Sequence, residues 1–362
     1  MRKLLVLLSA VALMVAFTVP AMAAEKSVSF YGRVWMDTFI EDDSKEYNAG
    51  YTADDTDLRW DLNDNATSRF GANFKWGNMS ANTEIRPYSA SMYRQWWAAW
   101  DFGGGSLLVG HTWSPLYINA TICGQSHAGG SAGGYGFWVG DLRQAQIRLT
   151  TGGLTLALVE PNAATGVVAA TGTETDTTFP KIEATYALKL GTISLVPFFS
   201  YQTYDEVVLA TDKGYDIDSH VVGLTVRVPL GPGYVNAQVY QSKNPEEWGD
   251  GYYTGGFSAY FDGTGIKEVT GMGYSMTAGM KLSDTMSFEV GYGVAEYELD
   301  RTGTYEDTAS AMYAMLPITI AEGFTITPEI GVIDKEDHTD PINGKVEQGD
   351  MTYYGAVWKI HF

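Results

Sequence analysis

The clearest alternation of apolar and polar positions lies at the end of the chain, in residues 350–362. Every second residue back from the terminus is apolar or aromatic: Phe362, Ile360, Trp358, Ala356 and Tyr354. The residues between them are smaller or more polar. A period of two places one set on each face of a β-strand. Because the apolar face has aromatic side chains at both ends, it is typical of a strand that crosses a bilayer.

Short breaks rich in Gly, Asn, Asp and Pro alternate with long polar segments along the whole chain. The turns fall at Gly77-Asn78, Gly103-Gly104-Gly105, Thr151-Gly152-Gly153, Leu190-Gly191, Gly231-Pro232-Gly233, Ser283-Asp284 and Glu322-Gly323. The long segments fall at roughly 40–66, 88–92, 114–141, 162–179, 205–218, 243–267, 298–307 and 335–349. Seven turns and eight loops join sixteen strands, which predicts an all-β, antiparallel, up-and-down transmembrane β-barrel.

One further segment, Asp57–Leu62, also alternates, with Leu58, Trp60 and Leu62 on one face. We interpret it as the upper part of the second hairpin and not as a strand of its own. Eighteen strands is the alternative count.

The start of the chain predicts export. Arg2 and Lys3 precede the apolar stretch 4–19, and Ala21-Met22-Ala23 is a small-x-small cleavage site. We therefore expect a signal peptide over 1–23 and a single barrel domain over 24–362. The alternative, an N-terminal anchor helix, needs about 20 apolar residues. Without a longer apolar stretch, membrane residence requires a closed barrel, because lipid offers no partners for open sheet edges.

Charge and cysteine content narrow the function classes. Loss of Arg2 and Lys3 would change the formal net charge from −20 to −22. Such an acidic chain lacks the basic face that a nucleic-acid partner requires. Cys123 is the single cysteine, so it can form no intrachain disulfide and no cysteine metal site. We expect an inert thiol there and no cofactor.

Three motifs in the first third of the chain occur in a fixed order. They are Tyr31-Gly32-Arg33-Val34, then Ser68-Arg69-Phe70-Gly71 with Phe74-Lys75, then Arg94-Gln95-Trp96-Trp97 through Asp101-Phe102-Gly103 to Leu108–Pro115. With the terminal Phe362, they make the chain resemble the general diffusion porins of the Gram-negative outer membrane. Two departures are His111, where that family usually has an Arg, and the bulky Trp96-Trp97 pair.

The resemblance implies a trimer in the outer membrane, reached through the periplasm, with lipid and lipopolysaccharide as neighbours. It also implies that 114–141 is a third loop that folds into the lumen and narrows it. The residues of this constriction loop that we single out are Ser114, Asn119, Gln125, His127 and Asp141. The loop has no carboxylate before Asp141. The alternative is a flexible, glycine-rich extracellular loop.

Alternation predicts which charged side chains line the pore. An arginine on the lipid face costs about 2–4 kcal/mol near the bilayer midplane, whereas the lumen is wet. The basic residues placed inward are Arg33, Arg69, Lys75, Arg86, Arg94, Arg148 and His111. Asp37 and Glu84 share that face and partly offset them. An inward Arg94 forces Trp96 into the lumen and leaves Gln95 outside.

Other chemistry is sparse. Gly124-Gln125-Ser126-His127-Ala128 falls one residue short of the Gly-x-Ser-x-Gly motif, and the strand-to-helix turn that the motif needs is absent. The alternative is an outer-membrane phospholipase with a Ser–His pair. We expect no enzyme. The oxygen ligands of Asp334, Glu336, Asp337 and Asp340 suit Ca²⁺, with a solvated loop as the alternative.

We therefore expect an outer-membrane channel for passive diffusion of small hydrophilic solutes and ions, with a modest preference for anions. The subunit contacts of the trimer would lie on the strands from Tyr31 to Trp113, with Trp97, Trp100 and Phe102 adding apolar bulk. One alternative is a substrate-selective porin. It would be an oxyanion channel, or a sugar channel with a slide of Tyr31, Trp35, Trp96 and Trp113. The other is a non-conducting barrel for adhesion or structure.

Overall fold

The computed structural model describes residues 26–47, 53–62, 68–86, 93–119, 135–139, 143–162, 173–209, 213–245, 259–262, 265–299, 305–340 and 344–362. In these ranges, no helix is long and apolar enough to span a membrane. The expected signal peptide over 1–23 lies outside the described residues.

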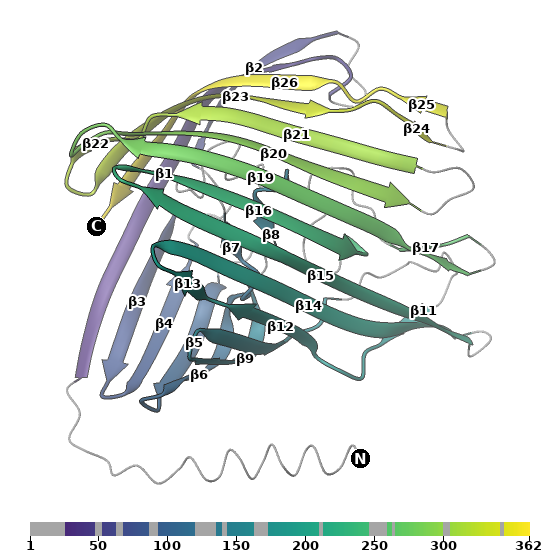
Figure 1. Ribbon diagram of the computed structural model, residues 1–362, viewed down its shortest axis with the longest axis horizontal. Helices are drawn as coiled ribbons and strands as arrows, with labels where there is room; N and C mark the ends of the chain where they lie inside the picture. Colours follow the sequence, from purple (N-terminus) through teal and green to yellow (C-terminus); the bar gives the residue numbers. More distant parts are fainter. Residues whose placement is uncertain are drawn as a thin grey trace.

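Sheet strands of six to nine residues form one side of the molecule, which we call the low wall. They are β3 (Arg69–Trp76), β4 (Met79–Ile85), β5 (Tyr93–Asp101), β6 (Gly105–Trp113), β9 (Arg143–Thr151), β10 (Leu154–Val159) and β12 (Lys181–Tyr186). Short glycine turns join most of them at the end where β1 begins. Figure 1 shows these strands in the lower part of the view, with β1 to their left and most of the longer strands above them.

Longer strands form the rest of the wall (Figure 1). They are β1 (Lys26–Asp43), β14 (Ile193–Val208), β15 (Lys213–Leu230), β16 (Gly233–Lys243), β19 (Val269–Lys281), β20 (Ser287–Leu299), β21 (Tyr305–Met315), β23 (Phe324–Lys335) and β26 (Asp350–His361). Four short pieces continue wall strands: β2 (Asp55–Leu62), β11 (Thr173–Asp176), β13 (Leu188–Leu190) and β22 (Ile318–Ala321). Three small ribbons stand apart from the sheet: β7 (Ile118–Asn119) with β8 (Trp138–Val139), β17 (Tyr260–Phe261) with β18 (Ile266–Lys267), and β24 (His338–Asp340) with β25 (Gly344–Val346).

The sheet closes into an antiparallel up-and-down barrel of sixteen strands, which confirms the predicted fold class. Closure comes from β1 and the final strand β26, which pair from Arg33–His361 to Asp43–Met351. The other edge of β1 pairs with β3 in its first half and with β2 in its second half. The segment Asp57–Leu62 therefore extends the first hairpin, one earlier than we expected, and adds no strand to the count.

The distribution of burial is inverted relative to a water-soluble protein. Large apolar side chains of the outer face are exposed, among them Phe70, Trp96, Val109 and Ile330. Charged side chains of the inner face are buried, among them Arg94 and Glu289. An apolar band of this extent is stable when lipid covers it, and the polar inner face is stable when water or ion pairs satisfy it.

A recurring side-chain arrangement stiffens the inner wall. A tyrosine, a glycine and a glutamate occupy paired positions on three successive strands. The two triads are Tyr31–Gly71–Glu84 and Tyr234–Gly279–Glu289. In each triad the tyrosine ring lies over the glycine, where a Cβ would collide with it, and the hydroxyl donates a hydrogen bond to the glutamate. Glycine is required there because any side chain would displace the ring.

The same packing predicts a stability difference between two strand glycines. Gly331 lies under the ring of Tyr353, whose hydroxyl donates to Glu329 at 2.9 Å, whereas the nearest atom to a Cβ at Gly214 is Val207 Cγ2 at 3.9 Å. We expect Gly331→Ala to lower the free energy of unfolding by about 1–3 kcal/mol, as overpacking does. Gly214→Ala should change it little. Urea unfolding in detergent micelles measures both, and equal effects would contradict the packing argument.

Candidate functional site: the inner wall of the barrel

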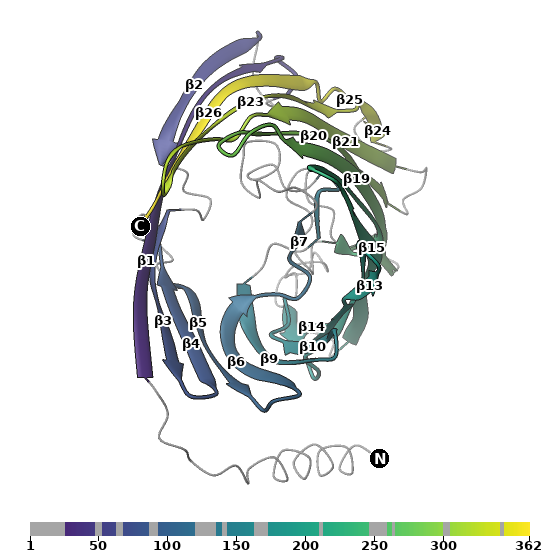
Figure 2. The ribbon, with the colours of Figure 1, turned by 60° about the vertical axis from the view of Figure 1, so that its left-hand side comes forward.

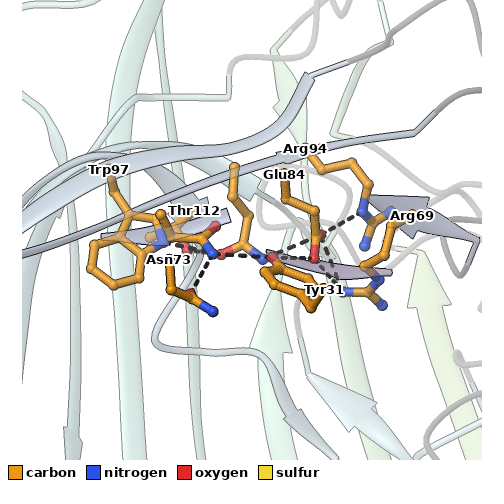
Figure 3. Close-up of polar contacts among 9 residues, drawn as sticks. Tyr31, Arg69, Asn73, Glu84, Arg94, Trp97 and Thr112 are labelled. Atoms are coloured by element: carbon orange, nitrogen blue, oxygen red, sulfur yellow. Dashed lines mark hydrogen bonds and ion pairs between the residues drawn. The ribbon is translucent and has the colours of Figure 1, made fainter. Parts of the chain in front are cut away.

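Glu84 lies at the centre of a charged cluster on the low wall (Figure 3). Its carboxylate accepts hydrogen bonds from Arg94 Nε at 2.8 Å, from Arg69 at 3.1 Å and from the Tyr31 hydroxyl at 3.0 Å. Glu84 and Arg94 are almost fully buried, at 2% and 1% exposure. Two guanidinium groups against one carboxylate leave this cluster with one excess positive charge.

A β-bulge explains how Arg94 reaches Glu84. Glu84 pairs with Gln95 and the next residue, Ile85, pairs with Tyr93, so Arg94 is an extra residue on β5. Bulges displace the normal alternation of faces. Consequently Gln95 also reaches Glu84, with Nε2 to Oε1 at 3.2 Å, and our placement of Gln95 outside was wrong.

The bulge also places the two neighbouring tryptophans on other faces than we predicted. Trp96 is 66% exposed on the outer face and is not in the lumen. Trp97 pairs with the inward Asn82 and donates its Nε1–H to Gln95, so it is not part of the outer apolar surface. Trp100 and Phe102 remain in mutual ring contact, with centroids 5.7 Å apart.

A second cluster surrounds Trp35 near the closing seam. Arg33 Cζ and Lys359 Nζ both lie 4.2 Å from the Trp35 ring centroid. The ring's Nε1–H donates to His361 Nε2 at 3.4 Å. Lys359 was missing from our predicted pore residues. Its alternation with the apolar Trp358 and Ile360 was a signal that could have found it.

Asp37 belongs to a separate ion-pair group. Arg59 of β2 lies 3.5 Å from Asp37 and 3.6 Å from Glu41. Asp37 is 2% exposed, so its charge is compensated within the wall. Arg59 was not among the predicted residues, although its alternation with Leu58 and Trp60 placed it inward.

The start of the segment 114–141 is fixed to the inner face of the low wall, at β12 and β9. Ser114 donates its hydroxyl to Glu183 of β12 and accepts the Leu116 N–H at 3.0 Å. Lys181 lies 3.1 Å from Glu183 and 2.6 Å from Gln144. The side chains of Ser114, Gln144, Lys181 and Glu183 are all nearly fully buried. Their polar atoms are shielded from water, so the hydrogen bonds and the ion pair among them are important for stability.

The described parts of this segment pack against inward side chains of the long strands. Leu116, Ile118 and Val139 form one apolar cluster with Phe198, Val221 and Tyr240. Tyr135 and Phe137 form another with Phe39, Tyr313 and Tyr353. Gln238 Nε2 donates to Gly136 O at 3.2 Å. Figure 2 shows β7 within the ring of strands.

Several residues of the predicted constriction loop cannot be placed. Gln125, His127 and Asp141 lie outside the described residues, and so does the side chain of Asn119. The narrowing of the lumen by the whole segment therefore stays a prediction.

The remaining predicted pore residues divide between the two faces. Arg148 is on the inner side and donates to Trp113 O at 3.4 Å. Lys75 shares the face of Arg69, and Arg86 lies close enough to Arg94 to repel it. Our placement of His111 in the pore was wrong. It pairs with the exposed Trp96 and shares the outer face with Val109, so it does not line the pore.

Within the acidic segment predicted to bind calcium, the structure describes an ion pair of Asp337, and the calcium site stays a prediction. Among the described residues, no three His, Cys, Asp or Glu are grouped to hold a metal ion. Asp337 binds Lys345 at 2.9 Å and the Gln348 N–H at 3.1 Å, and these contacts hold its pKa below the usual value. The side chain of Asp340 lies outside the described residues.

The anchor at Ser114 gives a testable expectation. Ser114→Ala removes one hydrogen bond to Glu183 and the acceptor for Leu116 N–H, a loss of about 1–3 kcal/mol for buried groups. We expect the segment to leave the wall more often. Single-channel recordings should then show added current fluctuations. Ser106→Ala, near the start of β6 and away from the segment, is the control, and identical noise in both variants would refute the anchor.

Comparisons with known proteins rest on structure, because no family model and no curated protein matches the sequence. The outer membrane channel DcaP of Acinetobacter baumannii matches with a TM-score of 0.67 and 15% identity, over 93% of this chain and 97% of that one. OmpT of Vibrio cholerae matches with a TM-score of 0.60 and 12% identity, over 95% and 99%. The chain has the fold of the outer-membrane porins.

A third match extends this porin fold to another genus. The anion-selective porin from Comamonas acidovorans matches with a TM-score of 0.59 and 13% identity, over 93% of this chain and 100% of that one. At such identities the shared property is the barrel. The charged groups on the inner wall of this porin-like barrel must therefore be interpreted from its own residues.

Proposed function

We propose that the protein is a channel of the Gram-negative outer membrane through which small hydrophilic solutes and ions diffuse passively. The observation that supports it is the inverted burial of a closed barrel, with an apolar outer face and a charged inner wall. An outer face of this kind suits lipid, and the inner wall suits water and ions. The proposal includes neither catalysis nor a cofactor.

A modest preference for anions follows from the low wall. Arg69, Arg94 and Glu84 together have one excess positive charge, and Arg33 and Lys359 stack on a neutral ring. A narrow passage bounded by low-dielectric walls strengthens such an excess. Acidic rim residues in the described part of the chain, such as Asp54, Asp55 and Glu347, are exposed, and charges beyond about 8–10 Å are largely screened at physiological salt.

The sugar-channel alternative has less support. A sugar slide needs aromatic faces open to the lumen, but Trp96 is on the outer face and both Arg33 and Lys359 contact the Trp35 ring. Two of the four proposed aromatic side chains are therefore not open to a sugar.

We propose a homotrimer with subunit contacts on the low wall. Its strands are six to nine residues long, whereas a strand that crosses hydrocarbon alone needs about 9–11 residues. Outward Phe30 and Phe70 stack there with centroids 6.1 Å apart, which adds flat apolar surface. The Vibrio cholerae protein has a form described as a trimer. A monomer in mild detergent by native mass spectrometry would contradict this assembly.

A planar-bilayer recording tests the channel and its preference together. We expect stepwise conductance, and a reversal potential in a KCl gradient that has the sign of chloride preference. A protein that inserts but gives no steps would be a non-conducting barrel, and a cation-selective channel would overturn the anion preference alone.

A further inference from the structure

A groove crosses the outer face of the long strands, on a part of the wall that does not belong to the low wall. It passes over β19, β20, β21, β23 and β26, which are adjacent in the sheet and lie side by side in Figure 1. Its volume is about 470 Å³. On β19, β20 and β21 its outward lining side chains are Met276, Ala278, Val290, Tyr292, Met312 and Ala314.

Short side chains form the floor of this groove. Ala278 pairs with Val290, and Val290 pairs with Ala314, so the three lie in a row on adjacent strands. The neighbouring outward row has longer side chains, all of them exposed: Met276, Tyr292 and Met312. These longer side chains make a raised edge beside the floor.

The groove runs from the turn end of the barrel toward the middle of the membrane. Ala278 lies three residues before the end of β19, whereas Val332, at the far end, lies eight residues after the start of β23. Four strand spacings of about 4.8 Å make the groove about 19 Å long. Because barrel strands are tilted by about 35–45°, a row across them rises by about 12 Å. This rise fits within the roughly 15 Å of hydrocarbon that one leaflet contributes.

Charges of both signs lie at the turn end of the groove. The Lys281 ammonium binds the Asp284 carboxylate at 2.8 Å, and the side chains are 58% and 99% exposed. Lys281 follows Ala278 on β19 at about 10 Å along the extended chain. A zwitterion is complementary to this pair, because a phosphate accepts hydrogen bonds from Lys281 while an ammonium donates to Asp284.

We propose that the groove binds one phospholipid of the periplasmic leaflet, with an acyl chain along the alanine floor and a zwitterionic headgroup at Lys281 and Asp284. The short turns of bacterial barrels face the periplasm, which puts the Lys281 end in that leaflet. The inference requires a barrel in a membrane, but it does not require that the barrel conducts.

Shape and charge distinguish this groove from the rest of the outer face. Lipid tails are as apolar as leucine, so the hydrophobic effect favours no particular place on a lipid-facing wall. A chain in the groove gains van der Waals contacts with the floor and with the raised edge, whereas a chain on a flat face contacts one side only. The paired charges at the turn end then fix the headgroup.

A phosphatidylethanolamine with a photoreactive diazirine on its acyl chain is the probe. The full-length barrel is reconstituted in phosphatidylethanolamine vesicles that contain a small fraction of this probe, and labelled peptides are identified by mass spectrometry. We expect peptides of β19, β20 and β21 to be labelled about fivefold more than those of β14 and β15, whose outward Phe199 and Val222 also face lipid.

Two substitutions fill the groove without making the outer face more polar. Ala278→Leu and Ala314→Leu should each lower the labelling of the groove peptides at least about threefold, because the added side chain takes the place of the acyl chain. Ala237→Leu is the matched control. Ala237 is on the outer face of β16 and pairs with Met276, but it does not line the groove, so its replacement should leave the labelling unchanged. Heat-sensitive gel migration confirms that each variant is folded.

The headgroup is tested with phosphatidylglycerol that carries the same diazirine, in phosphatidylglycerol vesicles. This lipid has no cation for Asp284, so we expect it to label the groove peptides about threefold less. Equal labelling by the two lipids would overturn the zwitterionic headgroup.

The outcomes separate this inference from the channel proposal. Even labelling over the whole outer face would refute the site, and so would unchanged labelling in both groove variants. A barrel that is labelled in the groove but does not conduct would refute the channel function alone. A protein that does not enter vesicles would refute both. Labelling that is concentrated at the groove and lowered only by the two groove variants supports the proposal.

Discussion

Replacing Arg69 and Arg94 together by alanine is expected to abolish the anion preference of the channel. The net charge of the cluster of Arg69, Arg94 and Glu84 then changes from one positive to one negative charge. Two units of charge at about 8 Å from a permeating ion change its energy by about 1 kcal/mol at the dielectric constant of water. We therefore expect the chloride-to-potassium permeability ratio to fall at least about fivefold. Reversal potentials in a KCl gradient measure it.

A second double variant controls for net charge. Lys189→Ala with Lys281→Ala removes the same two charges from exposed positions at the turn end of the barrel. Screening by salt should make its effect small. If both double variants shift the reversal potential equally, the inner-wall cluster does not determine selectivity.

Replacing Glu84 by leucine is expected to destabilise the barrel by about 3–5 kcal/mol. The reason is that Arg94 is 1% exposed and would retain a buried charge without the carboxylate that it binds. Urea unfolding in detergent micelles should show a lower midpoint with an unchanged denaturant slope.

Two companion variants separate charge from packing in this prediction. Glu84→Gln keeps an oxygen acceptor for Arg94 and should cost less. Glu84→Leu combined with Arg94→Met removes both partners, which often restores most of the lost stability at a buried ion pair. A double variant as unstable as Glu84→Leu alone would show that the Arg94 charge is not the cause.

The sequence by itself determined the barrel and the inward direction of most of its charges. Alternation is a local property, so Trp358 and Ile360 on one face of the final strand, or Arg69 against Phe70, needed no tertiary information. Turn residues such as Gly191 and Gly231, which adopt positive φ, are also a local signal, and they marked the strand boundaries. The correct count of sixteen strands follows from these signals.

His111 was misplaced although a local signal existed. The resemblance to porins suggested a basic residue in the pore, whereas alternation with Val109 indicated the outer face. Val109 is 54% exposed, and the register with Trp96 confirms the outer position. For this residue, the periodicity was the better predictor.

Only the tertiary structure decided the arrangements that depend on pairing between distant strands. The bulge at Arg94 arises because β4 and β5 slip by one residue relative to each other, which no single strand encodes. The contact of Lys359 with Trp35 exists because the last strand closes on the first, more than three hundred residues away. The cluster around Glu84 likewise depends on register, since a shift by one residue would turn every side chain of a strand to the other face.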